Sequence, residues 1–395
     1  MDLPSFPYSH LHGMDDTYPE YARQRQADPV PLVRLTSGGQ AYLVTRYADV
    51  RRVFSDPVFS RAAVARPGTA VLTETSRLPH VMLNMDPPDH TRLRRLVTRA
   101  FTTGAVERLR PRVTEIADGL VGELIAHGPP VDFVAAFATA LPALVISDLL
   151  GVPAADRIAV CGWVDVMLST GAYTLEEHAA AMGELMAYLD KLIAAKRAEP
   201  AGDLVSDLIA ARDEGDRLSE AELFNTVFVL IAGGFETTAS LLANALLTLH
   251  RHPDQWALLR DRPELLPRAV DELLRYVPIA WSSLERVATA DTELAGVRIP
   301  AGSTVIPMTY SANHDTDLTA DADRLDLTRT PLPHMAFGYG IHRCVGAPLA
   351  RLELQTAFGI LARRLPKLRP AVPEPALTWK AGVMTVGPVA LPVRW

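Results

Sequence analysis

The feature that most constrains the fold is the long helical pattern at residues 220–251, EAELFNTVFVLIAGGFETTASLLANALLTLHR. Ser219 and Glu222 have the spacing of a capping box at its start, and Pro253 stands where it must end. From DPPDHTRLRRLVTRAF (86–101) to about residue 275 the pattern stays mostly helical. We therefore expect a large helical body with residues 220–251 as its longest helix.

Strand patterns are confined to short segments near both ends of the chain. They occur in QAYLVT (40–45), in VRIPAGSTVIPM (297–308) and in TWKAGVMTVGPVALPVRW (378–395). We expect a mainly α fold with a small β lobe drawn from about 30–60, 280–310 and 375–395. A helix capped near Thr45 should follow the first strand, and residues 60–85 should form a long loop of the kind that usually has a function.

Size and composition narrow the class of protein. A chain of 395 residues exceeds the roughly 250–300 residues of one hydrophobic core, so we expect either two domains or one large fold with a helical body and a smaller lobe. The net charge of −7 argues against a general nucleic-acid binder. Two cysteines, no signal-peptide pattern and no apolar run of about 20 residues predict a soluble cytoplasmic protein with no membrane contact. Arginine and alanine enrichment suggests a GC-rich actinobacterial genome.

Cys344 stands in an unusual setting, HMAFGYGIHRCVGAPLARLELQ (334–355). Pro348 suits the first turn of the helix predicted behind it, and a helix N-terminus stabilises a thiolate. Gly338, Gly340 and Gly346 would let the backbone approach a flat ligand closely. The alternative is a buried structural cysteine, which is the commoner role of a lone thiol.

The middle of the long helix breaks the rules of a stable core helix. Gly233 and Gly234 each cost roughly 1 kcal/mol relative to alanine, and Glu236, Thr237 and Thr238 interrupt an apolar stretch. These residues predict either a kink with threonines bonded back to carbonyls one turn earlier, or a helix that widens over a ligand. In the second case an acid and an alcohol would face a site that consumes protons.

Two further charged pairs have helical spacing. Glu272 and Arg275 stand at i, i+3, which is usually a surface pair worth a few tenths of a kcal/mol. His90 and Arg94 stand at i, i+4, and they indicate either a solvated basic face or a site for an anionic group.

Together these four segments resemble the cytochrome P450 family, the heme-thiolate monooxygenases. The family signature F-x-x-G-x-H/R-x-C-x-G is filled by Phe337, Gly340, His342, Cys344 and Gly346. The acid-alcohol pair, the E-x-x-R pair and the arginine of ADADRLDL (320–327) occur in family order. The resemblance covers nearly the whole chain. It implies a single domain over 1–395, with a triangular helical body and heme between the long central helix and the helix behind Cys344.

The resemblance also implies a role for each residue. Cys344 would ligate the iron of heme b, and Glu236 with Thr237 would relay the protons that oxygen activation consumes. The other cofactor-binding residues would be His90, Arg94, Arg286, Phe337, Gly338, His342, Gly346, Gly233 and Gly234. Glu272, Arg275 and Arg324 would form a buried structural cluster.

Substrate and electron supply follow from the same resemblance. The expected reaction inserts one oxygen atom of O2 into a C–H bond, by hydroxylation or in some cases epoxidation, of an apolar secondary metabolite such as a macrolide, in antibiotic biosynthesis. The expected pocket residues are Val229, Ala232, Ile279, Trp281, Val383 and Met384. NAD(P)H would supply electrons through a ferredoxin reductase and ferredoxin, and the ferredoxin would dock on Arg92, Arg95, Arg99, Arg343 and Arg351. We expect a monomer.

Three other interpretations compete with this one. A heme-thiolate peroxygenase would have less need of the Glu236–Thr237 pair. A binding or recruitment domain without redox chemistry would have no need of Cys344. A cysteine hydrolase would have to use Cys344 with His342, and residues at i and i+2 in a glycine loop give poor nucleophile-base geometry.

Overall fold

The protein is described from a computed structural model, which covers residues 3–8, 17–78, 80–168, 173–211, 218–380 and 385–395. The chain forms two compact units. Unit 1 comprises residues 1–92, 271–326 and 330–344, and unit 2 comprises residues 93–270, 327–329 and 345–395. That the two units act as one domain stays a prediction.

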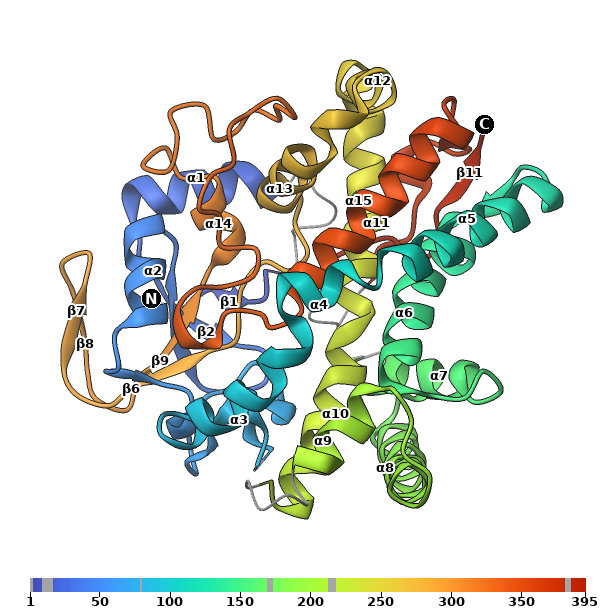
Figure 1. The fold of residues 1–395 in the computed structure, drawn as a ribbon. Coiled ribbons are helices and arrows are strands. Elements are labelled where there is room, and N and C mark those ends of the chain that lie inside the picture. The colour runs from blue at the N-terminus through green and yellow to red at the C-terminus, as the bar shows by residue number, and fades with distance from the viewer. Residues whose placement is uncertain (1–2, 9–16, 79, 169–172, 212–217, 381–384) are drawn as a thin grey trace. The chain divides into compact units, whose positions relative to one another are not determined.

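Unit 1 is built on a six-stranded sheet of order β1-β2-β3-β9-β6-β4 (Figure 1). Its strands are β1 (Ser5–Phe6), β2 (Leu32–Leu35), β3 (Gln40–Val44), β4 (Phe59–Ser60), β6 (Arg286–Ala288) and β9 (Thr304–Pro307). Strand β3 pairs in parallel with β9, in the register Leu43 to Ile306. Because side chains alternate along a strand, Ala41 and Leu43 join one apolar cluster and Val44 joins another.

The remaining elements of unit 1 are short. They are α1 (Thr17–Ala27), α2 (Tyr47–Ser55), α14 (Thr309–Asn313), the 3-10 turns η1 (Ala62–Ala65), η2 (Glu74–Arg77), η3 (Met82–Asn84) and η8 (Gly340–His342), and the hairpin β7 (Thr292–Leu294) and β8 (Val297–Ile299). Residues 60–85 thus form a loop with short turns, as predicted. Thr45 does not cap α2: its hydroxyl donates to the carbonyl of Pro29, and Asp315 Oδ2 accepts the Tyr47 amide at 2.7 Å.

Unit 2 is the helical body. Its helices are α4 (Thr103–Glu107), α5 (Arg110–His127), α6 (Ala140–Leu150), α7 (Arg157–Leu168), α8 (Leu175–Ala198), α9 (Leu204–Ala211), α10 (Glu220–Gly234), α11 (Glu236–Arg251), α12 (Pro253–Asp261) and α15 (Ala347–Arg364). The short turns are η4 (Arg99–Phe101), the π-helical η5 (Val134–Thr139), η7 (Pro263–Leu265) and η9 (Glu374–Ala376). Helices α3 (Asp89–Thr98) and α13 (Leu266–Tyr276) are shared between the units.

Helices α10 and α11 run through the middle of unit 2, where α6 contacts both and η5, α12 and α15 contact α11 (Figure 1). The predicted capping box is present, because Ser219 Oγ accepts the Glu222 amide and Glu222 Oε2 accepts the Ser219 amide. The predicted single helix is interrupted at Phe235, whose φ of −125° leaves the helical range. The irregularity expected from the glycines is therefore a break between two helices.

By length and composition, the segment Glu220–Arg251 is the one candidate membrane span among the described residues. Its most apolar 18-residue window is 72% buried inside the structure, which is typical of a core helix.

The C-terminal strand corrects the predicted β lobe. Strand β11 (Pro392–Arg394) pairs antiparallel with β10 (Arg369–Pro370) and with β5 (Val131–Asp132) in a separate three-stranded sheet of unit 2. Strand β11 therefore does not join the sheet formed by residues 30–60 and 280–310. A strand pattern in the sequence does not reveal which edge the strand will pair with.

Candidate active site

The loop that carries Cys344 is closed by its own backbone. The Cys344 amide donates to the carbonyl of Phe337 at 2.9 Å, and the Met335 amide donates to Asn313 Oδ1 at 2.6 Å. Cys344 is exposed and lies three residues before the start of α15 in the chain. Pro348 occupies the first turn of α15, as predicted. The thiol is therefore accessible at the end of a short, internally bonded loop.

Two glycines give this loop its path. Gly338 and Gly340 have φ values of +67° and +70°, which side-chain-bearing residues rarely adopt. A Cβ on Gly340 would lie 2.6 Å from the carbonyl oxygen of Phe54, at the end of α2. The requirement for glycine at position 340 of the signature thus has a local cause, since the loop passes directly over the backbone of α2.

Two of the predicted anion-binding residues meet in unit 1. The rings of His90 and His342 lie 4.2 Å apart between centroids, and His90 is fully buried. Arg94 follows His90 by one turn of α3, in the part of that helix assigned to unit 2. The pairing of His90 with His342 joins two segments that are 252 positions apart only through the fold.

Arg286 provides the test of whether this site fits the heme that the resemblance implies. Its side chain is 3% exposed, lies over the ring of Phe54, and donates to the carbonyl of Leu284. No carboxylate pairs with it among the described residues. Burial, together with repulsion from Arg61, lowers the pKa of Arg286 to about 9. A buried guanidinium without an anion is costly, so the site fits a group that brings its own carboxylate, as a heme propionate does.

Glu236 begins α11 directly after the helix break and is almost fully buried. Its Oε1 accepts from Lys380 Nζ at 2.6 Å and from Thr385 Oγ1 at 2.8 Å. Ser240 Oγ, one turn along α11, lies 3.4 Å from the same oxygen. Lys380 and Thr385 were not among the residues singled out from the sequence, and no motif in the sequence points to them.

Thr237 and Gly233 share the open side of the break. Thr237 is exposed, and its hydroxyl lies 3.4 Å from the Gly233 carbonyl, which matches the predicted back-bonding. A Cβ on Gly233 would meet nothing within 4 Å, whereas one on Gly234 would lie 2.5 Å from Ile146 of α6. The prediction that both glycines leave room for a ligand is therefore corrected. Gly234 serves the packing of α10 on α6, and only Gly233 faces open space.

A buried acid that the sequence reasoning missed lies on α15. Glu353 is fully buried, and burial raises its pKa to about 8, with a hydrogen bond from Thr238 acting in the opposite direction. Its Oε1 has no hydrogen-bond partner among the described residues. A glutamate flanked by Leu352 and Leu354 is a weak signal of this burial. Glu353 is thus held neutral next to the residue that follows Thr237.

The E-x-x-R pair is buried rather than exposed. Arg275 donates through Nε and Nη2 to the two carboxylate oxygens of Glu272, each at 2.8 Å. Its guanidinium also donates to the carbonyls of Asn313, Ala322 and Arg324. The predicted burial of the Arg324 charge is wrong, since that side chain is 68% exposed and pairs with Asp326. Arg324 joins the cluster through its backbone oxygen.

The predicted substrate residues divide between the two units. Val229 and Ala232 are half-buried on α10, one turn apart. Ile279 is half-buried in unit 1, and Trp281 packs against Tyr310 with ring centroids 5.3 Å apart. Val383 and Met384 lie outside the described residues. The grouping of these side chains around a substrate stays a prediction.

The predicted docking arginines also divide between the units. Arg92 and Arg343 belong to unit 1, and Arg95, Arg99 and Arg351 belong to unit 2. Arg95, Arg99 and Arg343 are exposed, and the other two are half-buried. Whether the five form one patch stays a prediction.

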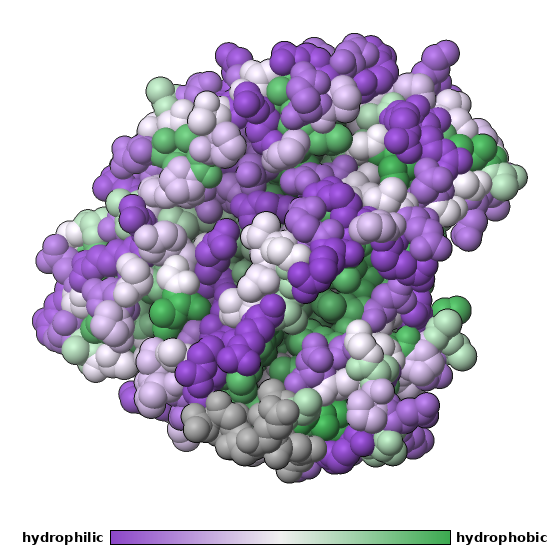
Figure 2. Space-filling view, viewed as in Figure 1, coloured by the Kyte–Doolittle hydropathy of each residue, from purple (hydrophilic) through white to green (hydrophobic). Residues whose placement is uncertain are grey.

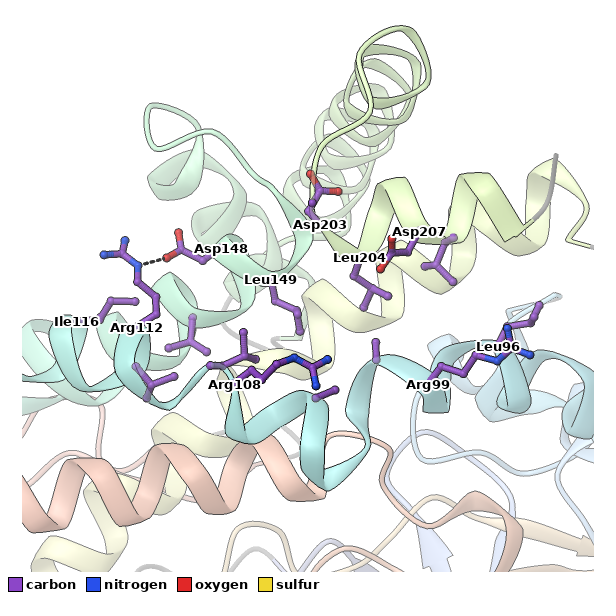
Figure 3. Close-up of a pocket in the computed structure, with 17 residues that line it drawn as sticks. Leu96, Arg99, Arg108, Arg112, Ile116, Asp148, Leu149, Asp203, Leu204 and Asp207 are labelled. Atoms are coloured by element: carbon purple, nitrogen blue, oxygen red, sulfur yellow. Dashed lines mark hydrogen bonds and ion pairs between the residues drawn. The ribbon is translucent and has the colours of Figure 1, made fainter. Parts of the chain in front are cut away.

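A cavity of about 590 Å³ in unit 2 includes only Arg99 of all the predicted site residues. Figure 3 shows Arg108 and Arg112 on one side of it and Asp203 and Asp207 on the other. On the face of the molecule shown in Figure 2, hydrophobic residues gather in a hollow near α4 and α6. Arg112 pairs with Asp148 at 2.7 Å. This cavity is therefore distinct from the loop of Cys344 and from the helix break at Phe235.

Comparison with known proteins identifies the family. The model of the family described as Cytochrome P450 matches residues 143–365. The chain is 46% identical to nocardicin C N-oxygenase of Nocardia uniformis subsp. tsuyamanensis, with 100% of this chain and 99% of the relative covered. It is 44% identical to mycinamicin IV hydroxylase/epoxidase of Micromonospora griseorubida, with 99% and 98% covered. The crystal structure of a cytochrome P450 hydroxylase from the leinamycin biosynthetic pathway of Streptomyces atroolivaceus matches with a TM-score of 0.92 at 43% identity, covering 100% of both chains.

These matches span the whole chain and agree with the signature around Cys344, the acid-alcohol pair at the helix break and the buried E-x-x-R pair. They also agree with the mainly helical fold and its small sheets. The chain therefore belongs to the cytochrome P450 family, and it is a monooxygenase related to actinomycete enzymes that tailor secondary metabolites.

Proposed function

We propose that this enzyme inserts one oxygen atom of O2 into a C–H bond of a largely apolar secondary metabolite of the macrolide or polyketide type, by hydroxylation or epoxidation, with electrons from a ferredoxin. The observation that carries the proposal is the helix break at Phe235, which buries Glu236 and turns Thr237 toward open space beside Gly233. An acid and an alcohol in that arrangement suit a reaction that uses dioxygen and consumes protons.

The residues that would hold the cofactor are those whose environment fits it. Cys344 would ligate the iron, and His90, Arg94, Arg286 and His342 would bind the two propionates. Phe337, Gly338, Gly346 and Gly233 would lie around the ring. When bound, heme b with a thiolate ligand supplies the chemistry that activates dioxygen.

The chain's own contribution is to hold that group, to exclude water and to deliver protons. Arg286 supplies a buried positive charge, and it forms no ion pair with an acid of the described residues, although the charges of Asp86 and Glu285 act on it from nearby. Glu236 has most of its surface withdrawn from solvent and contacts hydroxyl groups of its own unit. The Glu236 carboxyl would pass protons, and the Thr237 hydroxyl would orient the oxygen that receives them.

The substrate class is inferred from the lining residues and from the relatives. Val229, Ala232 and Gly233 are partly exposed on one side of α10, and two of them are apolar. Ile279, Trp281, Val383 and Met384 would complete an apolar pocket. One relative is named for mycinamicin IV, which makes this compound the first substrate to test.

The electron donor would be a small acidic protein, because exposed arginines such as Arg95, Arg99 and Arg343 would attract it. Reversal of Arg95 and Arg343 to glutamate should slow reduction by a ferredoxin and its NAD(P)H-dependent reductase. Arg260→Glu, an exposed arginine on α12, is the matched control. Equal rates in the two variants would place the docking surface elsewhere. We further propose a cytoplasmic monomer, which sedimentation of the purified protein would test.

The first experiment is the visible spectrum of the dithionite-reduced protein before and after addition of carbon monoxide. A Soret band moved far to the red, and lost in Cys344→Ser, is the expected result. Mycinamicin IV and related macrolides are then titrated for a low-to-high-spin shift, and labelled dioxygen is followed into the product. Product formed with hydrogen peroxide alone, and not with ferredoxin and dioxygen, would favour the peroxygenase alternative. A protein that takes up no heme would refute the proposal.

A further inference from the structure

The hydrogen bonds that Glu236 accepts from the described residues are all on one of its two carboxylate oxygens. Oε1 accepts from Lys380 Nζ at 2.6 Å and Thr385 Oγ1 at 2.8 Å, with Ser240 Oγ at 3.4 Å. Oε2 accepts no hydrogen bond from any residue that the structure describes. A carboxylate that only needed to be neutralised in the core would be expected to distribute its donors over both oxygens.

We propose that Lys380 and Thr385 are positioning residues that hold Glu236 by Oε1, so that Oε2 is kept for proton transfer. This inference rests on the proposed function of Glu236 as the acid of the proton relay. The ion pair fixes the rotation of the carboxyl group, and the ammonium compensates the buried charge. Charge compensation and orientation thus come from outside the α10–α11 helix pair.

The two anchoring residues come from a hairpin that is itself fastened to α11. Its two arms are joined by an isolated antiparallel bridge between Trp379 and Pro388, and the Lys380 amide donates to the carbonyl of Gly387 at 2.8 Å. Asn244, two turns beyond Glu236 on α11, donates from Nδ2 to the carbonyl of Val386 at 2.8 Å. The hairpin therefore has a backbone attachment to α11 that does not depend on Lys380. Removal of the lysine side chain should leave the hairpin in place.

Lys380 and Lys196 are the two lysines of unit 2 for which the structure shows an ion pair with a buried acid, Glu236 for Lys380 and Asp203 for Lys196. The side chain of Lys380 is 21% exposed and that of Glu236 is 10% exposed, which is far more buried than an ordinary surface pair. Lys367 belongs to the same unit, is exposed, and its side chain forms no hydrogen bond or ion pair with any residue that the structure describes. Lys367→Met is therefore a matched control for loss of a lysine charge.

The test compares Lys380→Met, Lys380→Arg and Thr385→Val with Lys367→Met and with Glu236→Gln. The fraction of NAD(P)H that ends in product rather than in hydrogen peroxide is measured with the substrate found by the spin-state titration. Lys380→Met should lower that fraction by roughly fivefold to tenfold, a part of the hundredfold or more that a positioned acid contributes. Lys380→Arg should restore it to within about twofold, because the guanidinium keeps a charge-assisted bond. KM should not change.

A second measurement requires neither substrate nor turnover. The unfolding midpoints of Lys380→Met, Glu236→Gln and the double variant form a thermodynamic cycle. The two single shifts should not add, because both variants remove the same ion pair. Additive shifts would overturn the inference. So would a Lys380→Met protein that converts the same fraction of NAD(P)H into product as Lys367→Met does. If Glu236→Gln converts as large a fraction of NAD(P)H into product as the wild type does, the proposed relay function of Glu236 fails instead.

Discussion

Replacement of Gly340 by alanine tests why the loop of Cys344 follows its path. Gly340 and Gly338 have nearly equal φ values, +70° and +67°, so alanine pays the same backbone cost at both, about 1–2 kcal/mol. They differ in what the new methyl group meets. At Gly338 the nearest atom is a ring carbon of Phe54 at 3.7 Å, which is an ordinary contact. At Gly340 it is the backbone oxygen of Phe54 at 2.6 Å, which the structure can relieve only by moving a backbone.

The extra cost at Gly340 should resemble that of overpacking a core, about 1–3 kcal/mol. Gly340→Ala is thus expected to lose about 2–5 kcal/mol of unfolding free energy, and Gly338→Ala about 1–2 kcal/mol. Urea unfolding of the two variants measures the difference. The carbon monoxide spectrum should show less of the thiolate-ligated form in Gly340→Ala, because the displaced loop carries Cys344. Equal stability losses in the two variants would refute the argument that close approach to α2, rather than φ alone, demands glycine at position 340.

Three further outcomes are expected from buried charges. Because burial raises the pKa of Glu353 to about 8, its contribution to stability is complete below the ordinary value of 4.5 and is lost as pH rises from there toward 8. Glu353→Gln should remove that decline, so the unfolding free energy of the variant, measured in urea, should rise relative to the wild type between pH 5 and pH 8. If the two proteins show the same pH dependence, the raised pKa of Glu353 is contradicted. Arg286→Leu should stabilise the heme-free protein, by relieving a buried charge that faces Arg61, and yet weaken heme retention. A loss of heme-free stability would show that Arg286 is needed by the chain itself. Arg275→Met should cost about 3–5 kcal/mol, because Glu272 keeps a buried charge without its partner. A cost below about 1 kcal/mol in thermal or urea unfolding would show that this pair contributes no more than an exposed ion pair does.

Much of the fold could be predicted because its signals are local. The capping box of Ser219 and Glu222, and the helix stop before Pro253, depend on residues within one turn of each other. The turn of the Cys344 loop was predictable for a similar reason, since the positive φ values of its glycines and the proline of α15 act on adjacent backbone. The close approach of Gly340 to Phe54 was not, because it depends on a distant segment. The family signature adds the role of the thiol, which local physics left open against a structural cysteine.

The polar partners of the site could not be predicted, because they come from distant segments. Glu236 and Lys380 are 144 positions apart, and no spacing rule links them. Asp315 rather than the neighbouring Thr45 satisfies the first amide of α2, again across more than 260 positions. Once a helix end is buried, whichever polar group the fold brings there will bond to it.

The sequence by itself determined where most helices and strands lie, where the long helix must be irregular, and which cysteine stands in the glycine-rich family signature. Only the tertiary structure decided that Gly234 packs on Ile146 while Gly233 faces open space. It also decided that Arg324 contributes a carbonyl rather than a buried charge, and that the last strand pairs with β5 and β10. The reason is that periodicity and capping act within a few residues, whereas burial and hydrogen-bond partners depend on what the rest of the chain places alongside.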